Sequence, residues 1–419
     1  MFIITLIKEK FNNKFVFVLI REILVKFLHT SDWHLGVKTN GKDRLGEQKK
    51  VLDEILSIAN YENVDCVIIA GDIFNTSNPS AEAEELFFDA VEKLSANGDR
   101  FVFVLAGNHD DPTRLSAGLP LAEKHNIALV GSLAKLPEKR FNQNGVVRVV
   151  ETGKGYIKLQ KNEEIVTIAY LPYPSDTRID EKKQVETETG EELSYPEKVQ
   201  AWAEIGAGAF SENEFNVFVS HLFLVGSKVN DGVVKVGDIM AVPANYLPKA
   251  NYTALGHIHK KQEVAENVYY SGAITKLAVS DQDLSVMLFE SENGKLINLY
   301  ESKLHTPARY EKVSVKSIEE AEEVLPSFDD GDIVELEIKC DHALSASDLK
   351  ALRKNYACIS NISLVRPTVS GEGFETKSRK FMSDEELFKQ FYKSVRGFDA
   401  SDDLVKMFID CKGENDEAD

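Results

Sequence analysis

Eight side chains that can bind a metal ion or transfer a proton follow apolar runs of the sequence. They occur as the patterns D-x-H, G-D, G-N-H-D, a single histidine and G-H-x-H, in that order along the chain. The eight residues are Asp32, His34, Asp72, Asn108, His109, His221, His257 and His259. Carboxylate, imidazole and amide donors together suit Mn²⁺, Fe²⁺ or Zn²⁺ better than Ca²⁺, which prefers oxygen alone. Because one ion takes about four to six donors, a set of this size predicts two ions.

Each pattern alone has a simpler explanation. A D-x-H triplet is weak support for a metal site, and G-D at the end of a strand is more often a turn or a helix cap. G-N-H-D is compatible with a tight turn, because glycine and asparagine both accept positive φ angles. Two histidines at alternate positions of an extended segment can also be core residues. The five patterns in one order, each after an apolar strand, favour a metal centre over these separate explanations.

Each group stands at the end of a segment that is typical of a buried strand. These segments are rich in β-branched and aromatic residues, and they span residues 26–32, 64–72, 101–110, 215–221 and 252–257. We expect the strand ends to converge at one sheet edge, although 227 positions separate the first group from the last.

Apolar stripes between these strands predict helices. One covers residues 45–58, and another covers residues 86–94 after Asn78-Pro79, which offers a cap followed by proline at the first helical position. This alternation predicts a layered α/β domain with its chemistry at the carboxyl ends of the strands. Residues 146–173 alternate as antiparallel strands do, and the acidic residues 175–200 are typical of a solvated insertion.

The C-terminal part of the chain predicts two smaller structures. Residues 309–369 have the order strand, helix, strand, helix, strand, which is a small α+β unit with its own core. Residues 382–409 contain two helical patterns, whose large apolar residues include Leu387, Phe388, Phe391, Tyr392, Leu404 and Phe408. Helices of about 12 residues are marginal alone in water, so they pack either on their own domain or in a partner's groove. The clustered aromatic residues favour the groove.

Length and charge restrict the class of protein. A chain of 419 residues exceeds one ordinary hydrophobic core, so two or more domains are expected. Its net charge of −19 provides no long-range attraction to nucleic acid or to an anionic membrane. The four cysteines have neither zinc-knuckle nor disulfide-scaffold spacing, which is typical of reduced thiols in the cytoplasm. Residues 1–25 have apolar stretches too short to span a bilayer; we interpret them as a leader of uncertain role, with an amphipathic membrane contact as the alternative.

The five patterns and their neighbours resemble the calcineurin-like metallophosphoesterase superfamily. The segments His-Thr-Ser-Asp-Trp-His-Leu-Gly (29–36), Ala-Gly-Asp-Ile-Phe-Asn-Thr (70–76) and Tyr-Thr-Ala-Leu-Gly-His-Ile-His (252–259) narrow the resemblance to the SbcD family, the nuclease subunit of the bacterial SbcCD exonuclease. The resemblance implies a layered β-sandwich flanked by helices at residues 26–300 and a DNA-guiding α+β capping domain at 305–370. It also implies a linker at 371–381 and ATPase-binding helices at 382–410, before an acidic tail at 411–419.

The resemblance also assigns roles to the eight groups. Asp32, His34 and His259 would hold one ion, Asn108, His221 and His257 a second, and Asp72 would bridge the two, which are most simply Mn²⁺. His109 would donate a proton to the departing sugar oxygen or hold the scissile phosphate. Asp110 either orients His109 or stabilises the turn.

The implied activity is that of a metal-dependent DNA exonuclease and endonuclease. It would process DNA ends and hairpins in repair, recombination and replication with an SMC-like ATPase, SbcC, as a homodimer within a heterotetramer, in the cytoplasm and without a membrane. The alternatives are a phosphoesterase acting on a small phosphodiester or a phosphoprotein, and a non-enzymatic scaffold. Departures from the family pattern at Asn75, at Ala273-Ile274 and in residues 226–238 bear on substrate handling more than on catalysis.

Overall fold

The computed structural model describes residues 24–39, 41–136, 140–175, 193–229, 232–233, 240–276, 284–340, 344–365, 388–389, 392 and 404–405. By its internal contacts the chain divides into two compact units, residues 1–365 and 366–419. The predicted leader up to residue 23, the linker and the acidic tail lie outside the described residues. Within the part that the structure describes, no helix is long and apolar enough to cross a membrane.

Six strands form the first sheet, in the order β19-β18-β1-β4-β5-β6. They are β1 (Val25–Thr30), β4 (Cys66–Ile69), β5 (Phe101–Leu105), β6 (Ile127–Val130), β18 (Ser285–Glu292) and β19 (Lys295–Lys303). β1, β4, β5 and β6 are parallel, whereas β18 and β19 add an antiparallel edge. Every residue of β4 and β5 is buried, which explains why the sequence of these strands is continuously apolar.

Seven strands form the second sheet, in the order β16-β17-β15-β10-β9-β8-β7. They are β7 (Arg148–Gly153), β8 (Tyr156–Lys161), β9 (Glu164–Leu171), β10 (Phe215–His221), β15 (Tyr252–Gly256), β16 (Gln262–Ala265) and β17 (Val268–Tyr270). The antiparallel strands predicted over residues 146–173 are confirmed, because β7, β8 and β9 pair in that sense. β9, β10, β15 and β17 are parallel.

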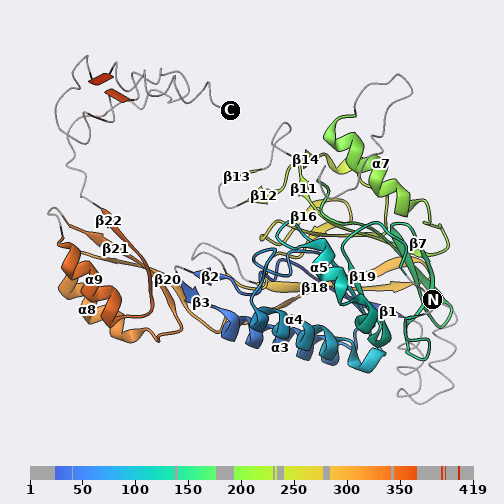
Figure 1. Ribbon diagram of the computed structural model, residues 1–419, viewed down its shortest axis with the longest axis horizontal. Coiled ribbons are helices and arrows are strands. Elements are labelled where there is room, and N and C mark those ends of the chain that lie inside the picture. Colours follow the sequence, from blue (N-terminus) through green and yellow to red (C-terminus); the bar gives the residue numbers. More distant parts are fainter. Residues whose placement is uncertain are drawn as a thin grey trace, which may run out of the picture. The chain divides into compact units, whose positions relative to one another are not determined.

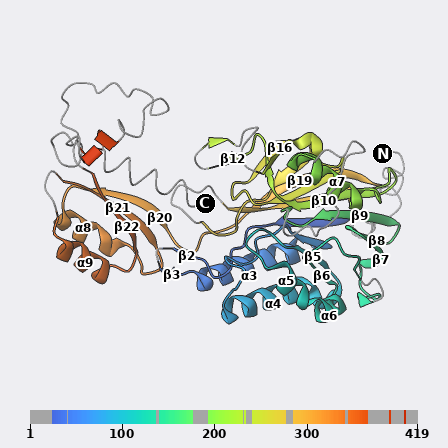
Figure 2. The same ribbon diagram turned by 45° about the horizontal axis from the view of Figure 1, so that its top comes forward.

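The two sheets face each other and helices cover their outer sides (Figure 1 and Figure 2). Phe27, Phe103 and Phe215 belong to the apolar core between the sheets. The helices α3 (Leu45–Tyr61) and α4 (Ala81–Leu94) pack on the first sheet, and α7 (Tyr195–Ala207) packs on the second. These layers confirm the predicted β-sandwich flanked by helices.

Short elements connect these layers. They comprise α5 (Pro112–Ala117), α6 (Leu119–Ala122), the strands β2 (Lys38–Thr39), β3 (Lys42–Asp43), β11 (Phe223–Leu224), β12 (Lys228–Val229), β13 (Gly232–Val233) and β14 (Ala241–Val242), and the 3₁₀ turns at Ala96–Gly98, Glu123–His125 and Ala244–Tyr246. A further 3₁₀ turn, Leu325–Ser327, lies C-terminal to both sheets.

Two predicted boundaries were wrong. Helix α4 begins at Ala81 and not at Pro79, because Ser80 has the extended cap conformation and its hydroxyl accepts a hydrogen bond from the Ala83 amide. The predicted insertion at residues 175–200 overlaps α7, which starts at Tyr195 after a capping box of Ser194 and Glu197. The buried side of α7 consists mainly of small residues, so its apolar stripe is weak in the sequence.

The five elements predicted over residues 309–369 are present in the expected order. They are β20 (Tyr310–Val315), α8 (Ile318–Val324), β21 (Ile333–Lys339), α9 (Ala346–Asn355) and β22 (Ile359–Val365). The three strands are parallel, and Val313, Leu336 and Leu352 belong to a core of their own. Because this cap lies in the same compact unit as the two sheets, the predicted domain boundary near residue 305 stays a prediction.

Few residues are described in the second unit. Phe388, Lys389, Tyr392, Leu404 and Val405 are helical, and the rings of Phe388 and Tyr392 lie 6.0 Å apart, as expected for neighbours on one helix face. The other predicted partner-binding residues, Leu387, Phe391 and Phe408, lie outside the described residues. The role of this set therefore stays a prediction.

Candidate metal centre

The eight predicted groups meet where the carboxyl ends of β1, β4 and β5 face those of β10 and β15. Three overlapping sets have ligand atoms within 4.8 Å of one another: Asp32, His34 and His259; His34, Asp72 and His109; and Asp72, His221 and His257. The expectation of one sheet edge was wrong, since the strands belong to two sheets. An apolar run reveals a buried strand but not the sheet that the strand joins.

The first set of donors surrounds His34. Its Nε2 atom lies 3.0 Å from His259 Nε2 and 3.6 Å from Asp72 Oδ2. His259 Nε2 lies 4.0 Å from Asp32 Oδ1. Metal–nitrogen bonds of about 2.0–2.1 Å place neighbouring ligand atoms roughly 3.0–3.4 Å apart. The separation of 3.0 Å between His34 and His259 fits an edge of a coordination polyhedron, whereas the separations of 3.6 Å and 4.0 Å to Asp72 and Asp32 require both carboxylates to move closer to a bound ion.

The second set of donors surrounds His221. Its Nε2 atom lies 3.1 Å from Asn108 Oδ1, 3.2 Å from His257 Nδ1 and 3.3 Å from Asp72 Oδ2. His221 Nδ1 lies 2.8 Å from the carbonyl oxygen of Ala70, to which it can only donate. This bond fixes Nδ1 as the donor, so Nε2 is the ring atom that faces a cation. The donor set therefore fits a second ion.

Asp72 joins the two sets. Its Oδ2 atom faces both His34 and His221, and its Oδ1 atom accepts a hydrogen bond of 2.9 Å from the His109 amide. A carboxylate between two ions about 3.5–4 Å apart is the usual bridge of a two-metal site. The geometry thus allows the bridging role that the family pattern implies.

Burial and neighbouring charge set the protonation of the candidate ligands. Burial lowers the pKa of His34 to about 3 and that of His257 to about 2, so both rings are neutral at pH 7 and can coordinate a cation. Burial alone would also lower the pKa of His221, but Asp72 raises it to about 9. Burial would raise the pKa of Asp72, but His221 and His34 lower it. This pair holds a proton that a divalent cation can replace.

Four of the candidate ligands have an unusual backbone conformation. The φ angles of Asp32, His34, Asp72 and His257 are 52°, 44°, 51° and 97°, all in the left-handed region that side chains disfavour. Such conformations persist where surrounding contacts hold them, and they cluster at functional sites. The loops hold each other here, because Asp32 N donates to Gly71 O and His34 N donates to Asp72 O, each at 3.0 Å.

The G-D and G-H-x-H patterns require glycine for steric reasons. A Cβ atom on Gly71, whose φ is +94°, would lie 2.3 Å from His221 Nδ1. A Cβ atom on Gly256 would lie 2.0 Å from Ala70 O and 2.7 Å from His221 Nδ1. Only glycine lets these strand ends approach the His221 ring so closely.

Two buried serines that the sequence did not single out support Asp32, Ser31 directly and Ser271 through Ser31. The Ser31 hydroxyl donates to Asp32 Oδ2 at 2.5 Å and lies 2.8 Å from Ser271 Oγ. Asp32 Oδ1 accepts a bond of 2.9 Å from the His257 amide. Ser31 directly precedes the D-x-H pattern, and Ser271 lies two residues before the departure at Ala273-Ile274. This proximity was the only signal in the sequence that could have pointed to the two serines.

His109 and Asp110 differ in environment. His109 is exposed, and its Nδ1 atom lies 2.8 Å from the carbonyl oxygen of Asn75. Asp110 is buried and accepts hydrogen bonds from the amides of Ile73, Phe74 and Gly107 at 2.8–3.1 Å, while burial raises the pKa of Asp110 to about 6. These contacts favour a loop-stabilising role for Asp110 over direct orientation of His109. His109 contacts the main-chain oxygen of residue 75, so this contact does not depend on the side chain at position 75.

Comparison with known proteins defines the family. Residues 25–261 match the model of the calcineurin-like phosphoesterases. The SbcD component of the nuclease SbcCD from Bacillus subtilis (strain 168) is 30% identical over 94% of this chain and 100% of that protein. This chain belongs to the SbcD family of calcineurin-like phosphoesterases. The SbcD protein of Staphylococcus saprophyticus is 24% identical over 89% of this chain and 94% of that protein. The SbcD protein of Escherichia coli (strain K12) is 30% identical over 65% of this chain and 66% of that protein.

Membership of the SbcD family confirms several predictions made from the sequence. The chain is a metal-dependent phosphodiesterase of the nuclease type, and it carries the predicted phosphoesterase fold. It binds divalent metal ions, for which the structure provides three overlapping donor sets. The individual role of each residue and the identity of the ions are not decided by family membership.

Proposed function

We propose that this chain is the DNA-cleaving component of an SbcCD-type complex and acts on double-stranded DNA ends and hairpins in repair, recombination and replication. The observation that carries the proposal is the convergence of seven candidate ligand side chains and His109 at the facing ends of two sheets. Its relatives are named as parts of the nuclease SbcCD, which supports the choice of substrate and assembly.

Two Mn²⁺ ions complete the proposed site. Asp32, His34 and His259 would hold one, Asn108, His221 and His257 the other, and Asp72 would contact both. When bound, such ions supply an activated water and neutralise charge on the phosphate oxygens. The runner-up metals Fe²⁺ and Zn²⁺ accept the same donors.

His109 is the proposed catalytic residue outside the ligand set. Its ring lies 4.9 Å from that of His34, and its bond to Asn75 O occupies Nδ1 and leaves Nε2 available to a substrate. Exposure of His109 and His259 marks the side from which a phosphate can enter. Donation of a proton from Nε2 to the departing sugar oxygen would accelerate cleavage by about 10²–10⁴-fold.

A basic partner would offset the acidity of this chain. Phosphate contacts normally require clustered lysine and arginine, whereas the net charge here is −19. We infer a heterotetramer with an SbcC-like ATPase, in the cytoplasm, in which residues 382–410 bind the ATPase and the cap at residues 305–370 guides DNA.

The test compares the purified chain with and without its ATPase partner on linear duplex, hairpin DNA and a chromogenic phosphodiester. We expect Mn²⁺-dependent cleavage of the diester by either preparation, and efficient cleavage of both DNAs only with the partner. Cleavage of the diester without any DNA cleavage in the complex would contradict the DNA substrate and favour a small phosphodiester or phosphoprotein.

A further inference from the structure

One buried side chain outside the motifs grips the loop that carries His34. Gln48 of α3 is fully buried, and its Nε2 atom donates to the carbonyl oxygens of Trp33 and His34, both at 2.9 Å. Its Oε1 atom accepts a bond of 3.1 Å from the Gly36 amide. The side-chain amide of Gln48 thus donates two hydrogen bonds and accepts one, all with residues of the same loop.

The His34 loop depends on such support. Strand β1 ends at Thr30, and both Asp32 and His34 have left-handed φ angles that the loop sequence itself disfavours. The Trp33 side chain is completely buried, so its main chain is fixed in a region from which water is excluded. A carbonyl in such a place requires a donor, and Gln48 provides one at Trp33 and another at His34. Gln48 therefore fixes the backbone from which the His34 ring projects.

The same turn of α3 contacts the cap. Arg44 is the N-cap residue of α3 and is almost fully buried. Its carbonyl oxygen accepts a hydrogen bond of 2.9 Å from the main-chain N–H of Gln48. The Arg44 guanidinium donates to Glu47 and to the hydroxyl of Tyr310, and it lies 5.1 Å from the centroid of the Tyr310 ring. Tyr310 is the first residue of β20.

Tyr310 also contacts the segment behind the other ligands of the first set. Its hydroxyl lies 2.9 Å from the carbonyl oxygen of Lys276. Five residues earlier, Ser271 bonds to Ser31, which holds Asp32, and the Ala273 amide donates to His259 O at 3.1 Å. Tyr310 therefore touches the two segments that support Asp32, His34 and His259.

We propose that Gln48 is a positioning residue for His34 and that Tyr310 of the cap, through the first turn of α3, extends this support to the first ion. The inference rests on the proposed two-metal site. The inference predicts an effect on one ion and not on the other. The described contacts of Gln48 and Tyr310 support the first donor set (Asp32, His34 and His259) and do not reach the second (Asn108, His221 and His257).

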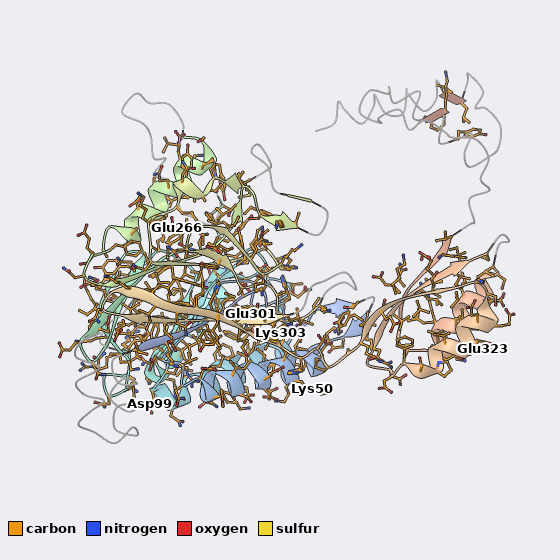
Figure 3. The ribbon with its side chains drawn as sticks, turned by 180° about the vertical axis from the view of Figure 1, so that it is seen from behind. Lys50, Asp99, Glu266, Glu301, Lys303 and Glu323 are labelled. Atoms are coloured by element: carbon orange, nitrogen blue, oxygen red, sulfur yellow. The ribbon has the colours of Figure 1, made fainter. Side chains whose placement is uncertain are left out.

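Calorimetric titration of the full chain with Mn²⁺ alone tests this separation. Loss of a hydrogen bond behind a ligand typically weakens metal affinity by about 10–100-fold. We expect Gln48→Met to weaken one of two binding events by at least about tenfold and to leave the other unchanged. Tyr310→Phe, which keeps the ring but removes the hydroxyl, should weaken the same event less. The matched control is Lys50→Met on the exposed side of α3 (Figure 3), which should bind as the unmodified chain does.

A second variant removes the donors but keeps the length of the side chain. Gln48→Glu keeps the length and the acceptor for Gly36 but lacks the two donors, so it should show the same selective loss as Gln48→Met. Unchanged affinity at both sites in these variants, or equal weakening at both together with a lower melting temperature, would overturn the positioning role. Wild-type binding by Tyr310→Phe would overturn the part assigned to the cap. If the unmodified chain binds fewer than two Mn²⁺ ions, the two-metal function fails instead.

Discussion

Asp72 is the residue on which both halves of the site depend, because one carboxylate faces His34 and His221. We expect Asp72→Ala to lose both ions, since each would lose a charged donor and the two imidazole sets would remain without a shared anion. Metal analysis of the purified variant after dialysis checks this. Full occupancy by two ions would remove Asp72 from the bridging role.

Replacement of His109 should reduce cleavage without loss of metal, in contrast to replacement of Asp72. Its ring belongs to a possible donor set with His34 and Asp72, but it is exposed and already bonded to Asn75 O. We expect His109→Gln to retain both ions and to lose diester cleavage by about 10²–10⁴-fold. Loss of metal together with activity would instead place His109 among the ligands.

The strand-to-loop junction after β4 requires glycine at position 71. A methyl group there would meet the His221 ring in a backbone conformation that costs a side chain about 1–2 kcal/mol even without a contact. We expect Gly71→Ala to lower the free energy of unfolding by more than this amount and to weaken metal binding. The control is Gly46→Ala in α3, where a methyl group meets nothing within 4 Å; similar losses in both variants would contradict the steric explanation.

The strands and the convergence of the eight side chains could be predicted because each buried strand is an apolar run that ends in a chemically distinctive group. The order of strands in the two sheets could not, because pairing between distant segments leaves no periodic trace. Gln48 and Ser31 were missed for a related reason: a polar residue in an amphipathic helix or beside a motif reveals its burial only after folding. Helix α4 was misplaced by two residues because Asn78 and Ser80 are both good caps.

The whole first unit should be stabilised by the ions it binds. Cations that bind only the folded arrangement of donors raise the free energy of unfolding, by about 2.7 kcal/mol at one hundred times the dissociation constant. We expect a chelator to lower the melting temperature and Mn²⁺ to restore it, with no response in Asp72→Ala. An equal response of that variant would show that Mn²⁺ acts elsewhere.

The C-terminal unit should act on assembly and not on chemistry. We expect Phe388→Glu with Phe391→Glu to abolish co-purification with the ATPase while diester cleavage survives, because buried charge would disrupt an apolar helix face. Tyr61→Glu with Leu121→Glu, which adds the same charge at exposed apolar residues of the first unit, is the control. Retained co-purification, or unfolding of the first unit, would favour packing of these helices on their own chain.

The central claim is that seven side chains from two sheets hold two ions. Anomalous diffraction from crystals grown with Mn²⁺ tests it most directly. We expect two peaks about 3.5–4 Å apart, one among Asp32, His34 and His259, the other among Asn108, His221 and His257, and both in contact with Asp72. A single peak, or peaks away from these residues, would contradict the account.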